Sequence, residues 1–270
     1  MASPQPHIPY LVCATPRSGS TLLCELLTAT GVAGRPAEHF EHLYATNQPR
    51  QAREYFDGIS DPEVLELLRP TEPGTPESAE AWEERLHDAL RDGMTPNGVW
   101  ASKLMWGYLL DFLRRLRERP QTADLKPAEA IETLLPGVRY VHVRRQDKLA
   151  QAISLWTAVQ TLAWRDEGEE DGGHDPVYSR AGIAHLLDQL TAQDQAWTSW
   201  FATAGIQPIV IAYEDFADDQ RGTIAELLRD LHVDTHGAVE IPDPGMRRQA
   251  GGRSQEWAER FKNETGAVAP

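Results

Sequence analysis

The sequence predicts an α/β fold in three layers, with a central parallel sheet flanked by helices. Short apolar segments alternate with longer segments of helical periodicity along most of the 270 residues. Because a strand that is followed by a helix usually returns to the sheet in parallel, this alternation predicts crossover units with helices on both faces. A chain of this length supports one substantial hydrophobic core, so we expect a single domain over residues 1–270.

Four segments have the composition of buried strands. Residues 9–14, PYLVCA, are almost continuously apolar and are followed at once by turn-forming residues. Residues 99–104 (VWASKL), 138–143 (VRYVHV) and 207–213 (QPIVIAY) complete the predicted sheet.

A helical pattern follows each predicted strand. Leucines between residues 22 and 27 predict a helix that begins near Ser20 and Thr21 and ends at Gly31. Further helices are predicted over 105–118, 147–164, 180–204 and 222–231, with a short helix near the C-terminus. Residues 45–97 and 165–178 are acidic and rich in proline or glycine, so we expect short helices and loops inserted into the domain there.

The charge balance disfavours partners with extended negative charge. A formal net charge of −15 gives no positive field for nucleic acid or an anionic membrane surface. The chain has no apolar run near the ~18 residues of a membrane span and no secretion signal at its start, so we expect a cytoplasmic location. The two cysteines, Cys13 and Cys24, are too few for a disulfide framework and are expected to be buried thiols.

The segment TPRSGST, residues 15–21, joins the first predicted strand to the first helix. The first N–H groups of a helix have no intrahelical partner and the helix dipole favours negative charge there, so this P-loop-like turn predicts an anion cradle. An ATP-binding loop has a lysine directly after its last glycine, but here Ser20 follows Gly19 and the cation appears earlier, at Arg17. A single cation before the glycine, together with several hydroxyl groups, favours a ligand whose 5′-phosphate carries one transferable group. Such a ligand can be held without a metal ion, unlike the triphosphate of ATP.

At this loop the sequence resembles the sulfotransferases that use 3′-phosphoadenosine 5′-phosphosulfate, whose loop reads roughly TxPKSGTTWL. TPRSGSTLL, GVAGRPAEHF, NGVWASKLMW and QAISLWTAVQTLAW together resemble the mycobacterial trehalose 2-sulfotransferase family, in the family's order over nearly the whole chain. The resemblance implies sulfuryl transfer from that donor to a carbohydrate hydroxyl, in particular the 2-hydroxyl of trehalose, and it implies a homodimer. It places the donor's 5′-phosphosulfate at Arg17, Ser18, Gly19, Ser20 and Thr21.

The resemblance also implies a second anion site for the donor's 3′-phosphate. The family pattern RxPxxxxxS has an arginine at a strand end and a serine on the next helix, and VRRQDKLAQAIS offers Arg145, beside Arg144, and Ser154. Arg145 and Ser154 are nine positions apart rather than eight, and Gln146 replaces the proline.

A basic segment near the C-terminus is a further candidate for donor binding. The family has a basic, glycine-containing loop before a tryptophan, and RRQAGGRSQEW offers Arg248 and Arg253, with Arg247, before Trp257. A solvated basic tail is the alternative, although a basic cluster in so acidic a chain calls for an explanation.

The acceptor hydroxyl requires a base, because an arginine such as Arg17 cannot exchange a proton at neutral pH and can only stabilise charge. The segment PAEHFEHL, residues 36–43, contains carboxylates and histidines. The resemblance places the catalytic carboxylate at Glu38, where an apolar pocket would suit it to general-base catalysis. His39 remains open as an alternative base and as an acceptor-binding residue.

Other residues and functions also remain open. Lys103, at the end of the second predicted strand, and Trp106 are candidates for acceptor binding, and Trp156 is a candidate for stacking on a ligand. On a helix, Glu38 and His42 would share a face, but no third ligand is evident and we expect no metal. A nucleotide-dependent kinase and a non-catalytic nucleotide- or sugar-binding module are the alternative functions.

Overall fold

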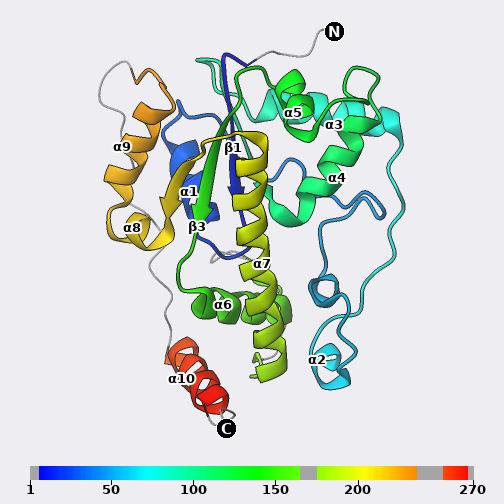
Figure 1. The fold of residues 1–270 in the computed structure, drawn as a ribbon, viewed down its shortest axis with the longest axis vertical. Coiled ribbons are helices and arrows are strands. Elements are labelled where there is room, and N and C mark those ends of the chain that lie inside the picture. Colours follow the sequence, from blue (N-terminus) through cyan, green and yellow to red (C-terminus); the bar gives the residue numbers. More distant parts are fainter. Residues whose placement is uncertain (1–5, 165–174, 236–251, 267–270) are drawn as a thin grey trace.

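The computed structural model describes residues 6–164, 175–235 and 252–266, and it confirms the predicted α/β fold with a central parallel sheet (Figure 1). In the described chain the sheet has four strands, β1 (Ile8–Ala14), β2 (Val99–Met105), β3 (Arg139–Arg144) and β4 (Ile209–Ala212). Their order is β2-β1-β3-β4, and each neighbouring pair is parallel. The first strand of the sequence therefore lies in the interior of the sheet.

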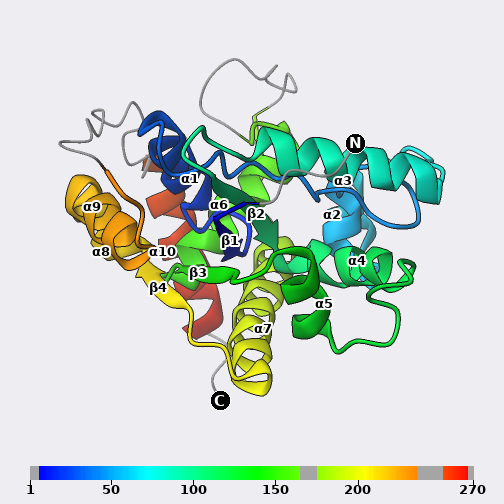
Figure 2. The ribbon, with the colours of Figure 1, turned by 90° about the horizontal axis from the view of Figure 1, so that it is seen from above.

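Helices cover both faces of the sheet and continue beyond one edge. Seen from above, α1 lies on one face and α7 on the other, with α4 and α5 on the same side as α7 (Figure 2). The helices are α1 (Ser20–Ala29), α2 (Pro62–Glu66), α3 (Ala79–Asp92), α4 (Trp106–Arg117), α5 (Pro127–Leu134), α6 (Lys148–Thr161), α7 (Arg180–Ala204), α8 (Tyr213–Asp218), α9 (Gln220–Asp230) and α10 (Gly252–Gly266), with a 3₁₀ helix η1 (Ala52–Phe56).

The predicted elements are present, with several differences at their ends. The fourth strand is shorter than predicted, because Tyr213 already begins α8. The helix predicted to end at residue 164 ends at Thr161, since Leu162 adopts a left-handed conformation with φ of 60°. The helices α3 and α10 are longer than expected, and α5 was not predicted. Of the expected insertion at 165–178, residues 165–174 lie outside the described residues.

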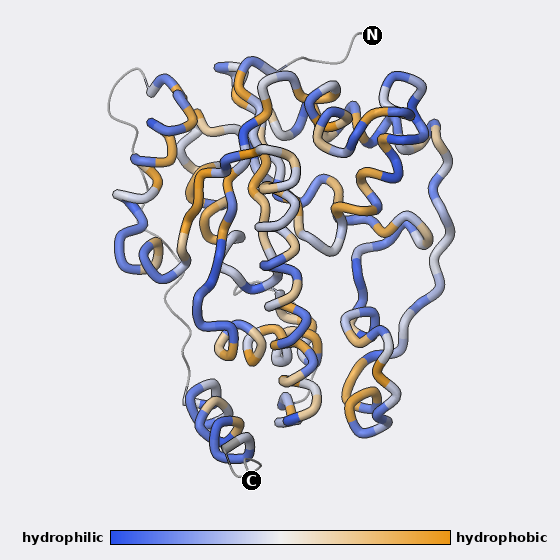
Figure 3. Tube along the Cα trace, in the orientation of Figure 1, coloured by the Kyte–Doolittle hydropathy of each residue, from blue (hydrophilic) through white to orange (hydrophobic). Residues whose placement is uncertain are grey.

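Two hydrophobic clusters hold the described elements together. The larger cluster surrounds the sheet, where β1 from Tyr10 to Ala14 is fully buried, and it includes the inner faces of α1, α4 and α9. The smaller cluster lies at the carboxyl edge of the sheet, where α6, α7, η1 and α10 pack around Trp156. Figure 3 shows this distribution as apolar segments along the strands and polar segments on the outer turns. No helix in the described ranges has the length and hydrophobicity needed to cross a lipid bilayer.

A buried carboxylate fixes the end of β3 against α7. The carboxylate of Asp194 accepts hydrogen bonds from Arg144, with Nη2 at 2.7 Å, and lies 3.5 Å from Lys148 Nζ. His142 Nε2 lies 3.6 Å from the same carboxylate. A buried carboxylate is costly unless it is paired, so these contacts together hold β3, the start of α6 and α7 in one arrangement.

We expect this network to make stability depend on pH through His142. Burial lowers the pKa of His142 from 6.5 to about 4, although the Asp194 carboxylate opposes the shift. As pH falls below 6.5 the unfolded chain binds a proton that the folded chain still excludes, so the free energy of unfolding decreases down to about pH 4. Urea unfolding should show a loss of about 1–3 kcal/mol over this window that the His142→Leu variant lacks.

The matched control replaces His7, an exposed histidine, by glutamine. Its pH dependence should follow that of the parent protein. Equal pH dependence in the parent and in His142→Leu would show that His142 does not contribute.

Candidate functional site

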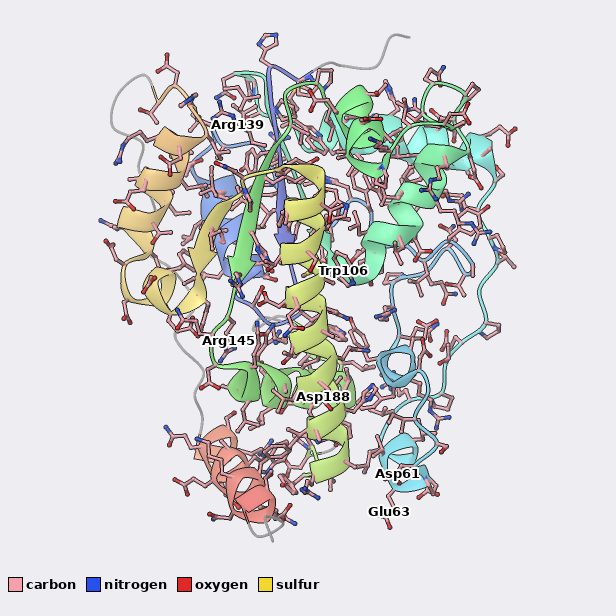
Figure 4. The ribbon with its side chains drawn as sticks, viewed as in Figure 1. Asp61, Glu63, Trp106, Arg139, Arg145 and Asp188 are labelled. Atoms are coloured by element: carbon pink, nitrogen blue, oxygen red, sulfur yellow. The ribbon has the colours of Figure 1, made fainter. Side chains whose placement is uncertain are left out.

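The carboxyl ends of the parallel strands bring three loops together at one edge of the sheet. Strands β1 and β3 point toward the lower half of Figure 1, where α6 and α10 lie. Arg145 lies just beyond the end of β3 and Trp106 just beyond β2, whereas Arg139, the first residue of β3, lies at the opposite edge (Figure 4). Ligands of open parallel sheets bind at this carboxyl edge, so the candidate site is located there.

The loop after β1, the predicted anion cradle, leads directly into α1. Gly19 precedes α1 with φ of 87°, and no described side chain caps the N-terminus of this helix. A Cβ atom on Gly19 would collide with the ring of Tyr213, so the position requires glycine for both its conformation and its space. The Ser18 hydroxyl is buried and has no hydrogen-bond partner among the described residues. The loop thus presents an uncapped helix N-terminus and an unsatisfied buried hydroxyl.

Three of the predicted donor-binding residues lie together beside this cradle. Arg17 donates from Nε to Ser154 Oγ at 3.0 Å and from Nη1 to the carbonyl oxygen of Trp164 at 2.7 Å. Arg145 donates to the carbonyl oxygen of Arg17 at 3.2 Å, and its guanidinium lies 4.7 Å from the ring centre of Tyr213. The departure of Arg145 and Ser154 from the family's spacing therefore does not separate them from the loop.

Tyr213 and Glu214 connect the loop after β1 to the loop after β3. The sequence analysis did not predict this role. The Tyr213 ring contacts both Gly19 and Arg145. The Glu214 carboxylate accepts hydrogen bonds from the backbone N–H groups of Gln146, at 3.0 Å, and Asp147, at 3.2 Å. Tyr213 was predicted as the last residue of the fourth strand, but only the tertiary structure shows that the next residue, Glu214, caps the loop before α6.

The predicted base lies beside the cradle because a lysine connects them. Lys103 Nζ is 2.7 Å from Glu38 Oε1 and 3.0 Å from Thr21 Oγ1. The Lys103 side chain is only 5% exposed, whereas that of Glu38 is 27% exposed. The backbone N–H of Lys103 donates to the carbonyl oxygen of Ala37. This hydrogen bond fixes the segment that carries Glu38 to β2. The ammonium thus joins the carboxylate to the first turn of α1.

The surroundings of Glu38 differ from the apolar pocket that we expected. Its closest described partner is the Lys103 ammonium, so the carboxylate is held by an ion pair. Residues 36–43 do not form a helix, and Glu38 and His42 therefore do not share a helix face. Within the described ranges, no three histidine, cysteine or acidic side chains are arranged to hold a metal ion.

His39 lies on the other side of its segment, away from Lys103. Its Nδ1 is 3.2 Å from Ser102 Oγ, which itself donates to the carbonyl oxygen of Ala37, so the histidine nitrogen is the donor. The imidazole stacks on Trp100, with ring centres 6.3 Å apart, and burial lowers its pKa. Ser102 and Lys103 are successive residues of β2 and their side chains point to opposite faces, so their partners His39 and Glu38 are separated.

The remaining predicted residues have different positions. Trp106 begins α4 and contacts Trp197 edge-to-face, with ring centres 5.1 Å apart, at the carboxyl edge. Trp156 is fully buried and donates to the carbonyl oxygen of Val177, so it belongs to the core and is not available for stacking on a ligand. Arg253, in α10, forms an exposed ion pair with Asp175 at 3.0 Å and has no described contact with the cradle. The predicted residues Arg247 and Arg248 lie outside the described residues.

The fold and this edge are typical of an α/β protein that binds an anionic group at a strand-to-helix loop, here next to a carboxylate. The sequence model of the Stf0 sulphotransferase family matches residues 9–264. The chain therefore belongs to the Stf0 sulphotransferase family, and it is a sulfotransferase. This confirms the resemblance stated from the sequence.

Two relatives match over almost their full length. The chain is 41% identical over 259 residues to a trehalose 2-sulfotransferase of Mycobacterium tuberculosis, covering 95% of each protein. It is 37% identical over 264 residues to a trehalose 2-sulfotransferase of Mycolicibacterium smegmatis, covering 94% of each. Among solved structures, the sulfotransferase domain of the Synechococcus PCC 7002 olefin synthase matches at 16% identity, with 98% of this chain and 97% of that domain covered and a TM-score of 0.44.

Proposed function

We propose that this sulfotransferase transfers the sulfuryl group of 3′-phosphoadenosine 5′-phosphosulfate to the 2-hydroxyl of trehalose. The contact that carries the proposal is the Lys103 ammonium, which joins the Glu38 carboxylate to the cradle hydroxyl of Thr21. An acceptor hydroxyl beside Glu38 is then also beside the anion held at α1. Trehalose is supported by the two mycobacterial relatives, both of which are trehalose 2-sulfotransferases.

The residues of the cradle fit a phosphosulfate group. The N-terminus of α1 has no side-chain cap in the described chain, and its first turn has no acidic residue that would repel an anion. The buried Ser18 hydroxyl lacks a protein partner among the described residues and is suited to bond a ligand oxygen. We assign the 5′-phosphosulfate to Arg17, Ser18, Gly19, Ser20 and Thr21.

The 3′-phosphate is assigned to the second loop. Arg145 and Ser154 lie next to Arg17, so one ligand can contact all three side chains. Arg248 and Arg253 remain proposed donor ligands from the C-terminal segment. Arg253 forms an exposed ion pair with Asp175 through Nη2, a kind of pair that contributes little to stability and leaves the guanidinium able to turn toward a ligand.

Glu38 is assigned as the general base. When bound, the donor supplies the sulfuryl group and a 5′-phosphate leaving group. Glu38 accepts the proton of the acceptor hydroxyl, while Lys103 holds the carboxylate in place through Oε1. Arg17 stabilises negative charge and does not exchange a proton. His39 is the weaker candidate base, because its Nδ1 is bonded to Ser102 on the other side of the segment.

The alternative functions are less well supported. A kinase that uses magnesium and ATP requires a lysine after Gly19, where this chain has Ser20. A non-catalytic binding module has no need for a carboxylate paired to the lysine that contacts the cradle. Membership in a sulphotransferase family also favours an enzyme over both alternatives.

We also propose that the protein is a cytoplasmic homodimer, as the family resemblance implies. Its two buried, unpaired cysteine thiols are compatible with a reducing compartment. Sedimentation equilibrium of the purified protein should give twice the mass of one chain. The mass of a single chain would contradict the dimer.

Incubation with a panel of sugars and labelled sulfate donor, read by mass spectrometry, tests the acceptor. We expect trehalose to gain one sulfate, at the 2-hydroxyl, and glucose and sucrose to gain little. Sulfation of a phenol or a lipid alcohol in place of any sugar would contradict the carbohydrate acceptor but would leave the donor assignment intact.

Replacing Glu38 by glutamine tests the base. Glutamine keeps the shape of the side chain but cannot accept the proton, so we expect kcat to fall by about 10²-fold or more. The affinity for adenosine 3′,5′-bisphosphate, measured by calorimetry, should stay near that of the parent. Glu25→Gln, on an exposed position of α1, is the matched control and should keep full activity. Full turnover in Glu38→Gln would exclude Glu38 as the base.

A further inference from the structure

Arg50 has an unused guanidinium near the proposed acceptor position. Among the described residues it makes no hydrogen bond or ion pair through its guanidinium, and its Nε is buried. Arg53, three residues later, instead donates to the carbonyl oxygens of Leu65 and Leu68. Buried N–H donors are almost always satisfied in folded proteins. Arg50 is therefore a candidate for binding a ligand.

Neighbouring residues hold the Arg50 guanidinium in place without satisfying it. The Arg50 backbone N–H donates to the Tyr108 hydroxyl at 2.8 Å. The guanidinium lies 5.4 Å from the ring centre of Tyr55, within the range of a cation–π contact. A side chain that is fixed in advance loses less conformational entropy when it binds.

The lack of a side chain at Gly107 provides room for this guanidinium. Gly107 is in the first turn of α4 and has no positive φ, so its backbone does not require glycine. A Cβ atom there would be 3.2 Å from Arg50 Nη1 and 3.6 Å from Cζ. Glycine inside a helix lowers helix propensity, and space for Arg50 is a reason for it here.

Arg50 also lies next to the residues that line the candidate site. Tyr55 stacks on Trp164, with ring centres 5.8 Å apart, and the carbonyl oxygen of Trp164 accepts from Arg17. Burial raises the pKa of both Tyr55 and Tyr108, and the Glu38 carboxylate raises both further. Tyr55 thus connects Arg50 to the residue that bonds Arg17, and both tyrosines lie within electrostatic range of Glu38.

We propose that Arg50 binds the acceptor, with its guanidinium donating to two neighbouring oxygens on the part of the sugar that does not receive sulfate. The planar guanidinium carries parallel N–H donors, a geometry that matches adjacent hydroxyls or an anionic substituent. The proposal rests on the proposed function, because it takes the space beside Glu38 as the acceptor position. It makes Arg50 a determinant of acceptor specificity and not a donor ligand.

Steady-state kinetics of Arg50→Gln tests this role. We expect KM for trehalose to rise about 10- to 100-fold, as for loss of charge-assisted hydrogen bonds, with kcat changed only a few-fold. The affinity for adenosine 3′,5′-bisphosphate should be unchanged. Arg69→Gln, at an exposed position of the same region, is the matched control and should keep the parent KM. An unchanged KM for both trehalose and trehalose 6-phosphate in Arg50→Gln, or an equal loss of affinity for the bisphosphate, would overturn the proposal.

Gly107→Ala provides a second test that leaves Arg50 in the chain. The added methyl group shifts the guanidinium slightly and raises helix propensity, so KM should rise without a loss of melting temperature. If Arg50→Gln does not fold, Arg50→Lys replaces it, because lysine keeps the positive charge but lacks the parallel N–H donors of the guanidinium. An unchanged KM in both Arg50→Lys and Gly107→Ala would overturn the proposal.

Two further arms separate the inference from the proposed function and identify the oxygens. If the parent protein does not sulfate trehalose, the acceptor assignment fails, and the Arg50 variants are then tested with whichever sugar the panel identifies. Comparing trehalose with trehalose 6-phosphate distinguishes the two kinds of oxygen. A penalty from Arg50→Gln that is equal for both supports hydroxyls, and a penalty confined to the phosphorylated sugar supports an anionic substituent.

Discussion

The parallel pairing of β1 with both β2 and β3 is the constraint on which the site depends. Because all three strands run in the same direction, their carboxyl ends lie at one edge, and every loop that follows a strand begins there. The pairing places Lys103 opposite Val12, two residues before β1 ends. From that position its ammonium reaches both α1 and the segment that follows it. A change in register would move the lysine to the other face of the sheet.

Three cationic side chains lie at this edge although the net charge of the chain is −15. Arg17, Arg145 and Lys103 lie around the cradle, and each is held by contacts within the protein. Tyr213 packs against the loop after β1 and Glu214 bonds the loop after β3, so the two loops share one support. An anion in an acidic protein therefore meets a local positive field whose geometry is already formed.

Local patterns were sufficient to predict the strands, most helices and the cradle. Strand β1 and Gly19 are recognisable from the sequence because a buried strand is a run of apolar residues and a tight turn requires glycine. Contacts between distant segments have no comparable local pattern. The roles of Glu214 and Arg50 were not predicted for this reason. Glu38 was identified by resemblance, but its pairing with Lys103 depends on the bridge between Ala37 and Ser102. The surroundings of a side chain are fixed by tertiary packing, which a single sequence does not show.

The pairing of Glu38 with Lys103 links the proposed base to the proposed donor cradle. A buried ammonium is unfavourable unless oxygen atoms surround it, and here one carboxylate oxygen and one hydroxyl do so. The same cation contacts both groups, so a displacement of Lys103 would weaken both contacts. The proposed base, Glu38, is therefore positioned by the strand that also supports the cradle, in addition to its own loop. Residues 36–43 can then lack regular secondary structure and still hold a carboxylate in a fixed place.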